Sequence, residues 1–239
     1  MDLSHFPTAG ALARGPQAPR WRPGLGGARH SEVFASSREA SGAVAALALA
    51  LDGLRARDAD KGRAVLWVQD AAALRLTGRP YRPGLPPELR RRLIHVVART
   101  CEDALFALEE GVRCRDLACV IGELAGNPRA LDFTASRRLT LASERHGVPL
   151  VLVRLDAERD LSSARMRWQV RSARSPEPLW NPAAPGPPTW HAELFRARGH
   201  TPGEWILSDD EHGLVATPAA APDHGAVAGA AGDRSLAAG

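Results

Sequence analysis

Residues 32–51 read EVFASSREASGAVAALALAL: a short apolar segment, a loop of small residues and a long run rich in Ala and Leu. This order predicts a strand that leads through a tight loop into a helix. A nucleotide-binding loop of the pattern GxxxxGK[S/T] needs glycines for close approach to phosphate, a Lys for the β- and γ-phosphates and a hydroxyl for magnesium. Here Ala35 and Ala40 stand at the glycine places, Ser41 at the Lys place and Gly42 at the hydroxyl place. We therefore predict a degenerate phosphate loop with no cofactor, although strand, turn and helix also begin any α/β domain.

Length and composition predict one globular domain. The chain has 239 residues, enough for one substantial core, and 44% of them are hydrophobic. Its net charge of +4 and its pI near 9.6 are compatible with acidic partners, nucleic acid among them, without requiring them. Cys101, Cys114 and Cys119 lack a CxxC spacing, so we predict neither a metal site nor a disulfide. The absence of a long apolar stretch predicts a cytoplasmic chain with no membrane partner.

Hydrophobic periodicity predicts an α/β domain with a mainly parallel sheet flanked by helices. Apolar runs predict strands at residues 64–68, 92–98, 117–121 and 149–155. Helices are expected from Arg38, with Val44, Leu47, Ala48, Leu51 and Leu54 buried; from the N-cap Thr100, with Ala104, Leu105, Leu108 and Val112 buried; and over residues 134–146, ended by Gly147. Residues 78–87 are too rich in Pro for regular structure and predict a surface loop. Because strands and helices alternate, right-handed βαβ crossovers follow.

The C-terminal part of the chain predicts an antiparallel extension at one edge of that sheet. Residues 165–171, RMRWQVR, alternate between polar and apolar side chains, with Met166, Trp168 and Val170 on the face expected to be buried. Further short strands are expected near residues 190–196 and 204–208. The low apolar content of the two ends predicts a flexible N-terminal arm at residues 1–28 and a disordered tail at residues 211–239, leaving residues 29–210 as the domain.

The order of these segments resembles a known family. HSEVFAS at residues 30–36 is similar to the RecA strand that enters the phosphate loop, and VLWVQD at residues 65–70 is similar to the second RecA strand. LDFTASRRLTLASERHGVPLVLVRL at residues 131–155 and PGPPTWHAELFRARGHTPGEW at residues 185–205 resemble more closely the ImuA family, the RecA-like and SulA-related accessory proteins of bacterial SOS mutagenesis. The resemblance covers about residues 29–208 and implies a RecA-like core.

The departures from RecA limit what the resemblance implies. The Walker residues are missing, and residues 155–163 form a far shorter segment than the RecA loop that holds single-stranded DNA. RecA's ATPase and DNA-contact residues are therefore not carried over to this chain. The resemblance implies a non-catalytic accessory protein, not an enzyme, that acts in translesion synthesis after DNA damage. Its implied partners are ImuB, a polymerase relative, and through it an error-prone polymerase, with RecA as a further candidate.

Two other functions stay open at this point. The relation to SulA is compatible with a cell-division inhibitor that caps a filament-forming division protein, and the RecA relation with a weak ATPase of DNA repair. Asp70 and Glu123 are expected at the carboxyl ends of neighbouring parallel strands, where ligands bind in open α/β sheets. No catalytic motif accompanies these two acids, so a polar rim is the simpler interpretation and we assign no catalytic residue.

Basic side chains are the remaining candidates for contact with a partner or with DNA. They are Arg137 and Arg138 on the predicted helix at residues 134–146, and Arg165, Arg167 and Arg171 in a row of period two. The alternative is that these arginines are solvated surface residues. If the row faces solvent, its side chains stand about 7 Å apart, which allows weak, salt-sensitive contact with DNA phosphates. Replacement of all three by Glu would then leave the fold intact.

Overall fold

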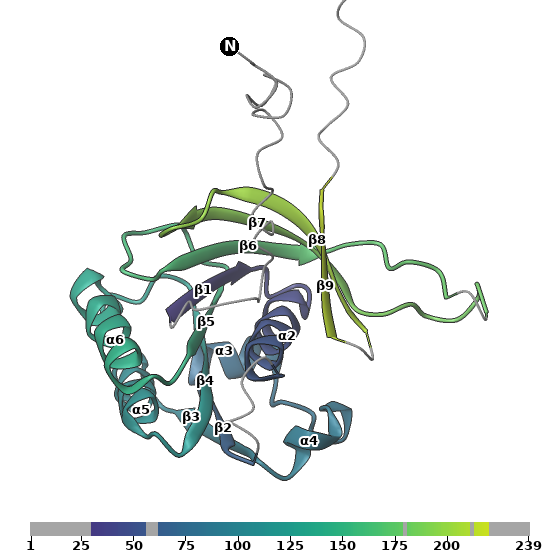
Figure 1. The fold of residues 1–239 in the computed structure, drawn as a ribbon. Helices are drawn as coiled ribbons and strands as arrows, with labels where there is room; N and C mark the ends of the chain where they lie inside the picture. Colours follow the sequence, from purple (N-terminus) through teal and green to yellow (C-terminus); the bar gives the residue numbers. More distant parts are fainter. Residues whose placement is uncertain (1–29, 56–61, 179–180, 211–212, 220–239) are drawn as a thin grey trace, which may run out of the picture.

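In the part of the chain that the structure describes, one nine-stranded sheet forms the centre, and helices cover both of its faces (Figure 1). The computed structural model describes residues 30–55, 62–178, 181–210 and 213–219. The strands are β1 (His30–Ala35), β2 (Ala64–Asp70), β3 (Leu93–Ala98), β4 (Leu117–Ala125), β5 (Leu150–Leu155), β6 (Met166–Ser172), β7 (Thr189–Ala197), β8 (Gly203–Asp210) and β9 (Gly213–Pro218). The helices are α2 (Ser41–Arg55), α3 (Ala71–Thr77), α4 (Pro87–Arg90), α5 (Cys101–Arg113) and α6 (Phe133–His146), with a 3-10 turn, η2 (Arg82–Gly84).

The sheet combines a parallel and an antiparallel part. Its strand order is β3-β2-β4-β5-β1-β6-β7-β8-β9. The strands β3, β2, β4, β5, β1 and β6, which are neighbours in this order, pair in parallel. Strands β7, β8 and β9 continue the sheet in antiparallel pairs. The predictions of a largely parallel sheet with flanking helices and of an antiparallel extension at one edge are confirmed. Strand β1 lies between β5 and β6, so its side chains meet those of two later segments of the chain.

Each face of the sheet has its own hydrophobic core. Helix α2 packs on one face, where Val33, Val153 and Trp168 are buried. Helices α5 and α6 lie side by side on the other face, where Leu108 of α5 packs with Leu150 of β5 and other buried aliphatic side chains (Figure 1). Because both faces of the central strands are covered, these strands are apolar almost throughout.

The predicted ends of two helices are confirmed. The Thr100 side chain accepts the Asp103 N–H and caps α5, and the four residues predicted to form its buried stripe are all buried. Helix α6 ends at Gly147, whose φ of 76° is the left-handed conformation that glycine adopts most easily. Both caps could be predicted from local sequence, because each depends on residues that are neighbours along the chain.

Helix α2 differs from its prediction in its start and in its contact face. It begins at Ser41, not at Arg38, and Val44 is 38% exposed although it was expected in the buried stripe. Leu47, Ala48 and Leu51 are buried as predicted, and the small side chains of Ala45 and Ala46 are buried as well. Small residues allow a helix to lie close to a sheet. The face of α2 that contacts the sheet is therefore wider than the predicted stripe of large side chains.

The edges of the domain also differ in part from the prediction. Residues 213–218, which were assigned to a disordered tail, form β9 and pair with β8, so that boundary was placed too early. Most of the predicted loop at residues 78–87 is irregular, although it contains η2 and reaches the first residue of α4. The predicted arm at residues 1–28 and the part of the tail after residue 219 lie outside the described residues.

Candidate partner-binding site

A carboxylate of the chain itself closes the loop between β1 and α2. The Oδ1 atom of Asp156, which follows β5, accepts the backbone N–H of Ser37 at 2.9 Å. The Asp156 N–H donates in turn to the Ala35 carbonyl at 3.0 Å. Hydrogen bonds from the side chain and then the backbone of Ser37 lower the pKa of Asp156, so the carboxylate is charged at neutral pH. A phosphate group at this loop would meet a negative charge where a phosphate loop offers N–H groups and a Lys.

Gly42, at the place of the magnesium-binding hydroxyl, serves packing instead. A Cβ atom on Gly42 would lie 2.7 Å from the Ala35 Cβ and 3.1 Å from Val153 Cγ1. This glycine therefore lets the first turn of α2 approach β1 and β5. A Ser or Thr hydroxyl has no room at this position.

Asp70 and Glu123 both serve the fold. Asp70 Oδ1 accepts the Ala73 N–H at 2.6 Å and caps α3. The Glu123 carboxylate is buried and accepts hydrogen bonds from Trp67 Nε1 at 2.6 Å and Thr77 Oγ1 at 3.0 Å. Burial raises the pKa of Glu123, and these donors act in the opposite direction. Both acids do lie at the carboxyl ends of neighbouring strands, as predicted, and there each accepts hydrogen bonds from neighbouring groups of the fold.

The five candidate arginines do not form one surface. Arg138 lies 3.5 Å from Glu109 of α5, and Arg171 is exposed near the opposite end of β6 from Arg165. Arg167 is only 3% exposed, so the predicted solvent-facing row of Arg165, Arg167 and Arg171 is wrong. The physical reason is that Arg167 pairs in register with Glu32 of β1, a buried carboxylate that needs a cation.

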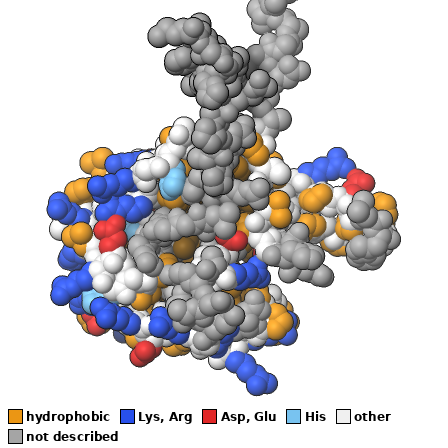
Figure 2. Space-filling view, in the orientation of Figure 1, with side chains coloured by type: hydrophobic (Ala, Val, Ile, Leu, Met, Phe, Trp, Pro, Cys, Tyr) orange, Lys and Arg blue, Asp and Glu red, His pale blue; other side chains and the backbone are white. Residues whose placement is uncertain are grey.

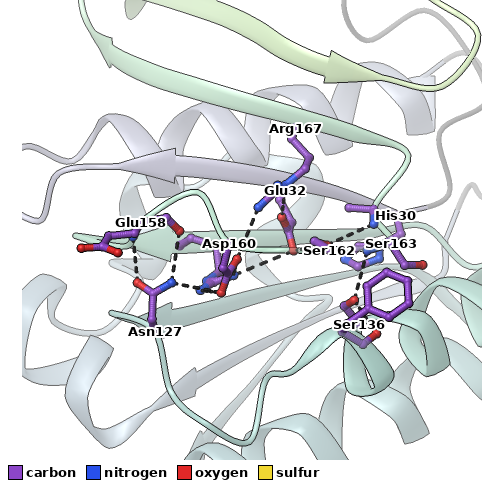
Figure 3. A network of polar contacts seen from close by, with 12 residues as sticks. His30, Glu32, Asn127, Ser136, Glu158, Asp160, Ser162, Ser163 and Arg167 are labelled. Carbon is purple, nitrogen blue, oxygen red and sulfur yellow. Dashed lines mark hydrogen bonds and ion pairs between the residues drawn. The ribbon is translucent and has the colours of Figure 1, made fainter.

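Arg167 belongs to a buried ion network that joins three adjacent strands (Figure 3). Its Nε donates to Glu32 Oε2 at 2.7 Å, and its Nη2 lies 3.4 Å from Asp160 Oδ1. Arg154 of β5 approaches the same Asp160 at 3.3 Å and donates to the Gly126 carbonyl at 3.2 Å. Two arginines, on β5 and β6, thus face two carboxylates: Glu32 on β1 between them and Asp160 in the segment that follows β5.

Aromatic rings complete the surroundings of these cations. The Arg167 guanidinium carbon lies 5.0 Å from the centre of the Phe34 ring and 5.3 Å from that of Phe195. The Arg159 guanidinium stacks over Phe195 at 3.9 Å and pairs with Glu193 at 2.6 Å. Asn127 holds the same loop from the other side, because its Nδ2 donates to Asp160 Oδ2 at 3.0 Å (Figure 3). The short segment after β5 is therefore fixed by charge and stacking.

A layer of hydroxyl groups connects this loop to α6. Ser163 Oγ donates to Thr140 Oγ1 at 2.9 Å, and the Ser163 N–H donates to Ser136 Oγ at 3.0 Å. The Thr140 hydroxyl donates to the Ser136 carbonyl, so the His30 Nδ1 contact at 2.7 Å is assigned as His30 donating to Thr140. His30 Nε2 then has no hydrogen-bond partner among the described residues. Burial lowers the pKa of His30 to about 4, so it is neutral at physiological pH.

A groove of about 570 Å³ lies above this layer, between α6 and the end of β7. It is lined by Phe133, Arg137, Thr140, Leu141, Ser162, Ser163, Ala164, Arg165, Arg196, Ala197 and Arg198. Four of these side chains are arginines, and no Asp or Glu is among them. Figure 2 shows Lys and Arg side chains gathered on the side of the molecule where α6 lies, with hydrophobic side chains between them. We take this basic groove as the candidate site.

The basic groove contains two of the predicted arginines, Arg137 and Arg165. Arg196 and Arg198 were not among the predicted site residues, although Arg196 ends the strand predicted near residues 190–196 and Arg198 follows it two residues later. Asp156 could not be predicted either, because no local pattern indicates that this acid reaches a loop more than a hundred residues earlier in the chain. The groove itself depends on the position of α6 beside β7, which follows only from the tertiary structure.

Other classes of site find little support in the described part of the chain. No group of three or more His, Cys, Asp or Glu residues that could hold a metal ion is found there. Cys119 is buried, Cys101 is half-buried and Cys114 is exposed. No helix within the described ranges has both the length and the apolar character needed to span a membrane.

Comparison with known proteins adds a family relation. The protein ImuA of Caulobacter vibrioides strain NA1000 / CB15N is 33% identical to this chain over 227 residues, and the match covers 87% of each protein. The ImuA of C. vibrioides strain ATCC 19089 / CB 15 matches to the same extent. No family model matches the chain. The match extends over most of the length of both proteins.

Proposed function

The chain belongs to the ImuA family, and from this premise we propose that it is a non-catalytic, RecA-like accessory protein of damage-induced mutagenesis. In this role it would act in translesion synthesis during the SOS response, through contacts with ImuB and, through ImuB, with an error-prone polymerase. RecA is a further candidate partner. The role is a cytoplasmic one, since the damaged chromosome lies there.

A RecA-like core is supported by the order and pairing of the elements. A strand, a tight loop and a helix open the domain, and the opening strand β1 then lies inside a parallel sheet between later strands. The segments that resemble the RecA core in sequence, residues 30–36 and 65–70, occupy β1 and β2. A fold of this kind does not determine activity, so the argument for function depends on the loop after β1.

The observation that carries the non-catalytic proposal is the Asp156 carboxylate at the β1–α2 loop. Its contact with the Ser37 N–H uses a donor that a phosphate would need, and its charge would repel one. The place of the phosphate-binding Lys is Ser41, and Gly42 is held against Ala35. These contacts support a degenerate phosphate loop in this segment. A chain that does not bind nucleotide would act through contacts with other proteins.

Two measurements on the full-length protein test this proposal. Calorimetry is expected to show no heat of ATP binding at millimolar nucleotide, and purified ImuB from the same organism is expected to be retained by the immobilised chain. Micromolar ATP binding with hydrolysis would contradict the non-catalytic role. Retention of the cell-division protein in place of ImuB would favour a SulA-like inhibitor and would also contradict the proposal.

A further inference from the structure

Helix α6 presents a stripe of exposed side chains to the basic groove. Phe133, Arg137 and Leu141 follow one another at intervals of four residues and so share one face of the helix. Phe133 is 47% exposed and Leu141 is 52% exposed. At about 1.5 Å per residue, successive members of the stripe stand about 6 Å apart along the helix axis. The stripe therefore offers an apolar, a cationic and a second apolar position in a row.

The opposite wall of the groove adds positive charge. Arg165, Arg196 and Arg198 line it from the start of β6 and the end of β7. Glu144 pairs with Arg165 from the rim, which neutralises one of the four arginines, and the groove stays positive overall. Arg196 Nη1 contacts the Ser162 carbonyl at 3.5 Å, a long bond that an acidic ligand can replace.

The two walls are fixed in advance of binding. The Ser163 N–H and hydroxyl bind Ser136 and Thr140 of α6, and the Ser162 hydroxyl binds the buried Glu32 at 2.7 Å. The loop that forms one wall is thereby attached both to the helix that forms the other wall and to the sheet beneath. A preformed groove loses little conformational entropy when a ligand enters.

We propose that the basic groove binds a short acidic segment of a partner protein in an extended conformation. Side chains two residues apart on an extended peptide point the same way and stand about 6.6 Å apart, close to the interval of the α6 stripe. A segment with an apolar residue, an acid and an apolar residue at alternate positions would thus meet Phe133, Arg137 and Leu141 in turn. Acids at the intervening positions would face Arg196 and Arg198. This inference depends on the proposed function, since it assigns a partner chemistry to the scaffold.

A protein segment fits the groove better than nucleic acid does. Contact with a DNA backbone needs a row of outward-facing cations, but Arg167 is buried in ion pairs and Arg171 lies outside the groove. Phe133 is the one aromatic side chain in the lining of the groove, so successive bases would find a single ring to stack on. Arginines next to large apolar side chains are, by contrast, the composition that protein interfaces favour.

Peptide selection on the full-length protein tests the proposal. A random peptide library displayed on phage is selected on the wild-type chain, and selected peptides are synthesised with a fluorescent label for anisotropy titration. We expect them to carry Asp or Glu between two large apolar residues at alternate positions. Their affinity should decrease at least tenfold in the variant Arg137→Glu/Arg196→Glu and should decrease as salt increases. The matched control, Arg171→Glu/Arg174→Glu, changes the net charge equally outside the groove and should bind as the wild type does.

Other outcomes would overturn the proposal. Selected peptides without acids, or peptides that bind the groove variant and the wild type equally, would show that this groove does not recognise an acidic segment. A labelled oligodeoxythymidine that binds more tightly than the peptides and needs Arg137 and Arg196 would assign the groove to nucleic acid. A chain that binds these peptides as expected but does not retain ImuB would contradict the proposed function and leave the peptide site standing.

Discussion

Arg167 is a buried cation whose charge is matched by Glu32 and Asp160. Replacement by Met keeps much of the side-chain volume, but Arg154 is then the single cation that faces the carboxylates of Glu32 and Asp160. Removal of one partner of a buried ion pair typically costs about 3–5 kcal/mol, so we expect a decrease of this size in the free energy of unfolding of Arg167→Met. Urea unfolding followed by circular dichroism measures it.

A double variant shows whether the cost comes from the unpaired charge. In Arg167→Met/Glu32→Leu the remaining Arg154 still pairs with Asp160, so the loss should be smaller than the sum of the two single losses. Additive losses would contradict the network. The triple variant Arg165→Glu/Arg167→Glu/Arg171→Glu is expected to unfold, because Glu at position 167 places a third carboxylate beside Glu32 and Asp160.

His30 gives the protein a predictable dependence on pH. Burial is the main cause that lowers its pKa to about 4; Arg165 and Arg167 act in the same direction, and Glu32 and Glu144 oppose it. As the pH falls, the unfolded chain takes up this proton first, near its ordinary pKa of 6.5. The contribution of His30 is therefore complete above pH 6.5 and is lost progressively between about pH 6.5 and pH 4, by about 3 kcal/mol in total.

Comparison with His30→Asn isolates this effect from that of the other histidines. Asn can keep a hydrogen bond to Thr140 but does not titrate, so the difference in unfolding free energy between wild type and variant should shrink from pH 7 to pH 4.5. Urea titrations at several pH values measure the difference. Parallel pH profiles for the two proteins would show that the imidazole is solvated.

Helix α2 depends on a glycine at its first turn. The Cβ of Ala at position 42 would lie 2.7 Å from the Ala35 Cβ, which is bonded directly to the backbone of β1 and cannot rotate away. We expect Gly42→Ala to reduce the free energy of unfolding by about 1–3 kcal/mol, although Ala has the higher helix propensity. Gly53 of the same helix is the matched control, because a Cβ atom added there would meet no atom within 4 Å.

The Gly53→Ala control should be neutral or stabilising by up to about 1 kcal/mol. An equal gain in both variants would mean that α2 lies farther from β1 than the Gly42 contacts indicate. The same geometry bears on nucleotide binding, because a Thr at Gly42 would displace the helix. Restoring Lys and Thr at Ser41 and Gly42 is therefore not expected to create an ATP site.

Local elements could be predicted from the sequence, whereas contacts across the sheet could not. The Thr100 cap, the Gly147 terminus and the buried Trp168 each follow from neighbours along the chain or from a period of two. The same period placed Arg167 on the solvent side, because alternation distinguishes two faces but does not show that the second face is covered as well. The buried carboxylate of Glu32 indicates that Arg167 is buried too, but only the strand order shows that these two residues are neighbours.

The candidate site shows the same limit at the scale of the molecule. Arg137 and Arg165 were named from sequence as separate candidates, on a helix and before a strand. The pairing of β6 with β7 brings Arg165 beside Arg198, whose N–H donates to the Arg165 carbonyl, and the position of α6 adds Arg137 and Phe133. The basic groove consists of three segments that are distant in the sequence, so its existence depends on the topology. The sequence alone shows the basic residues but not that they form one groove.

The antiparallel edge gives a prediction for the whole domain. Strand β9 pairs with β8 along its length, and its Leu214 and Ala216 pack against the core on the α2 side. A chain ended after residue 210 loses this strand and leaves the β8 edge and the adjoining core side chains uncovered. We expect its free energy of unfolding to fall by about 2 kcal/mol relative to a chain ended after residue 219, which keeps every described strand. Thermal unfolding of the two truncated chains measures the difference, and equal midpoints would mean that β9 adds nothing to the domain and that its C-terminal boundary does lie at residue 210.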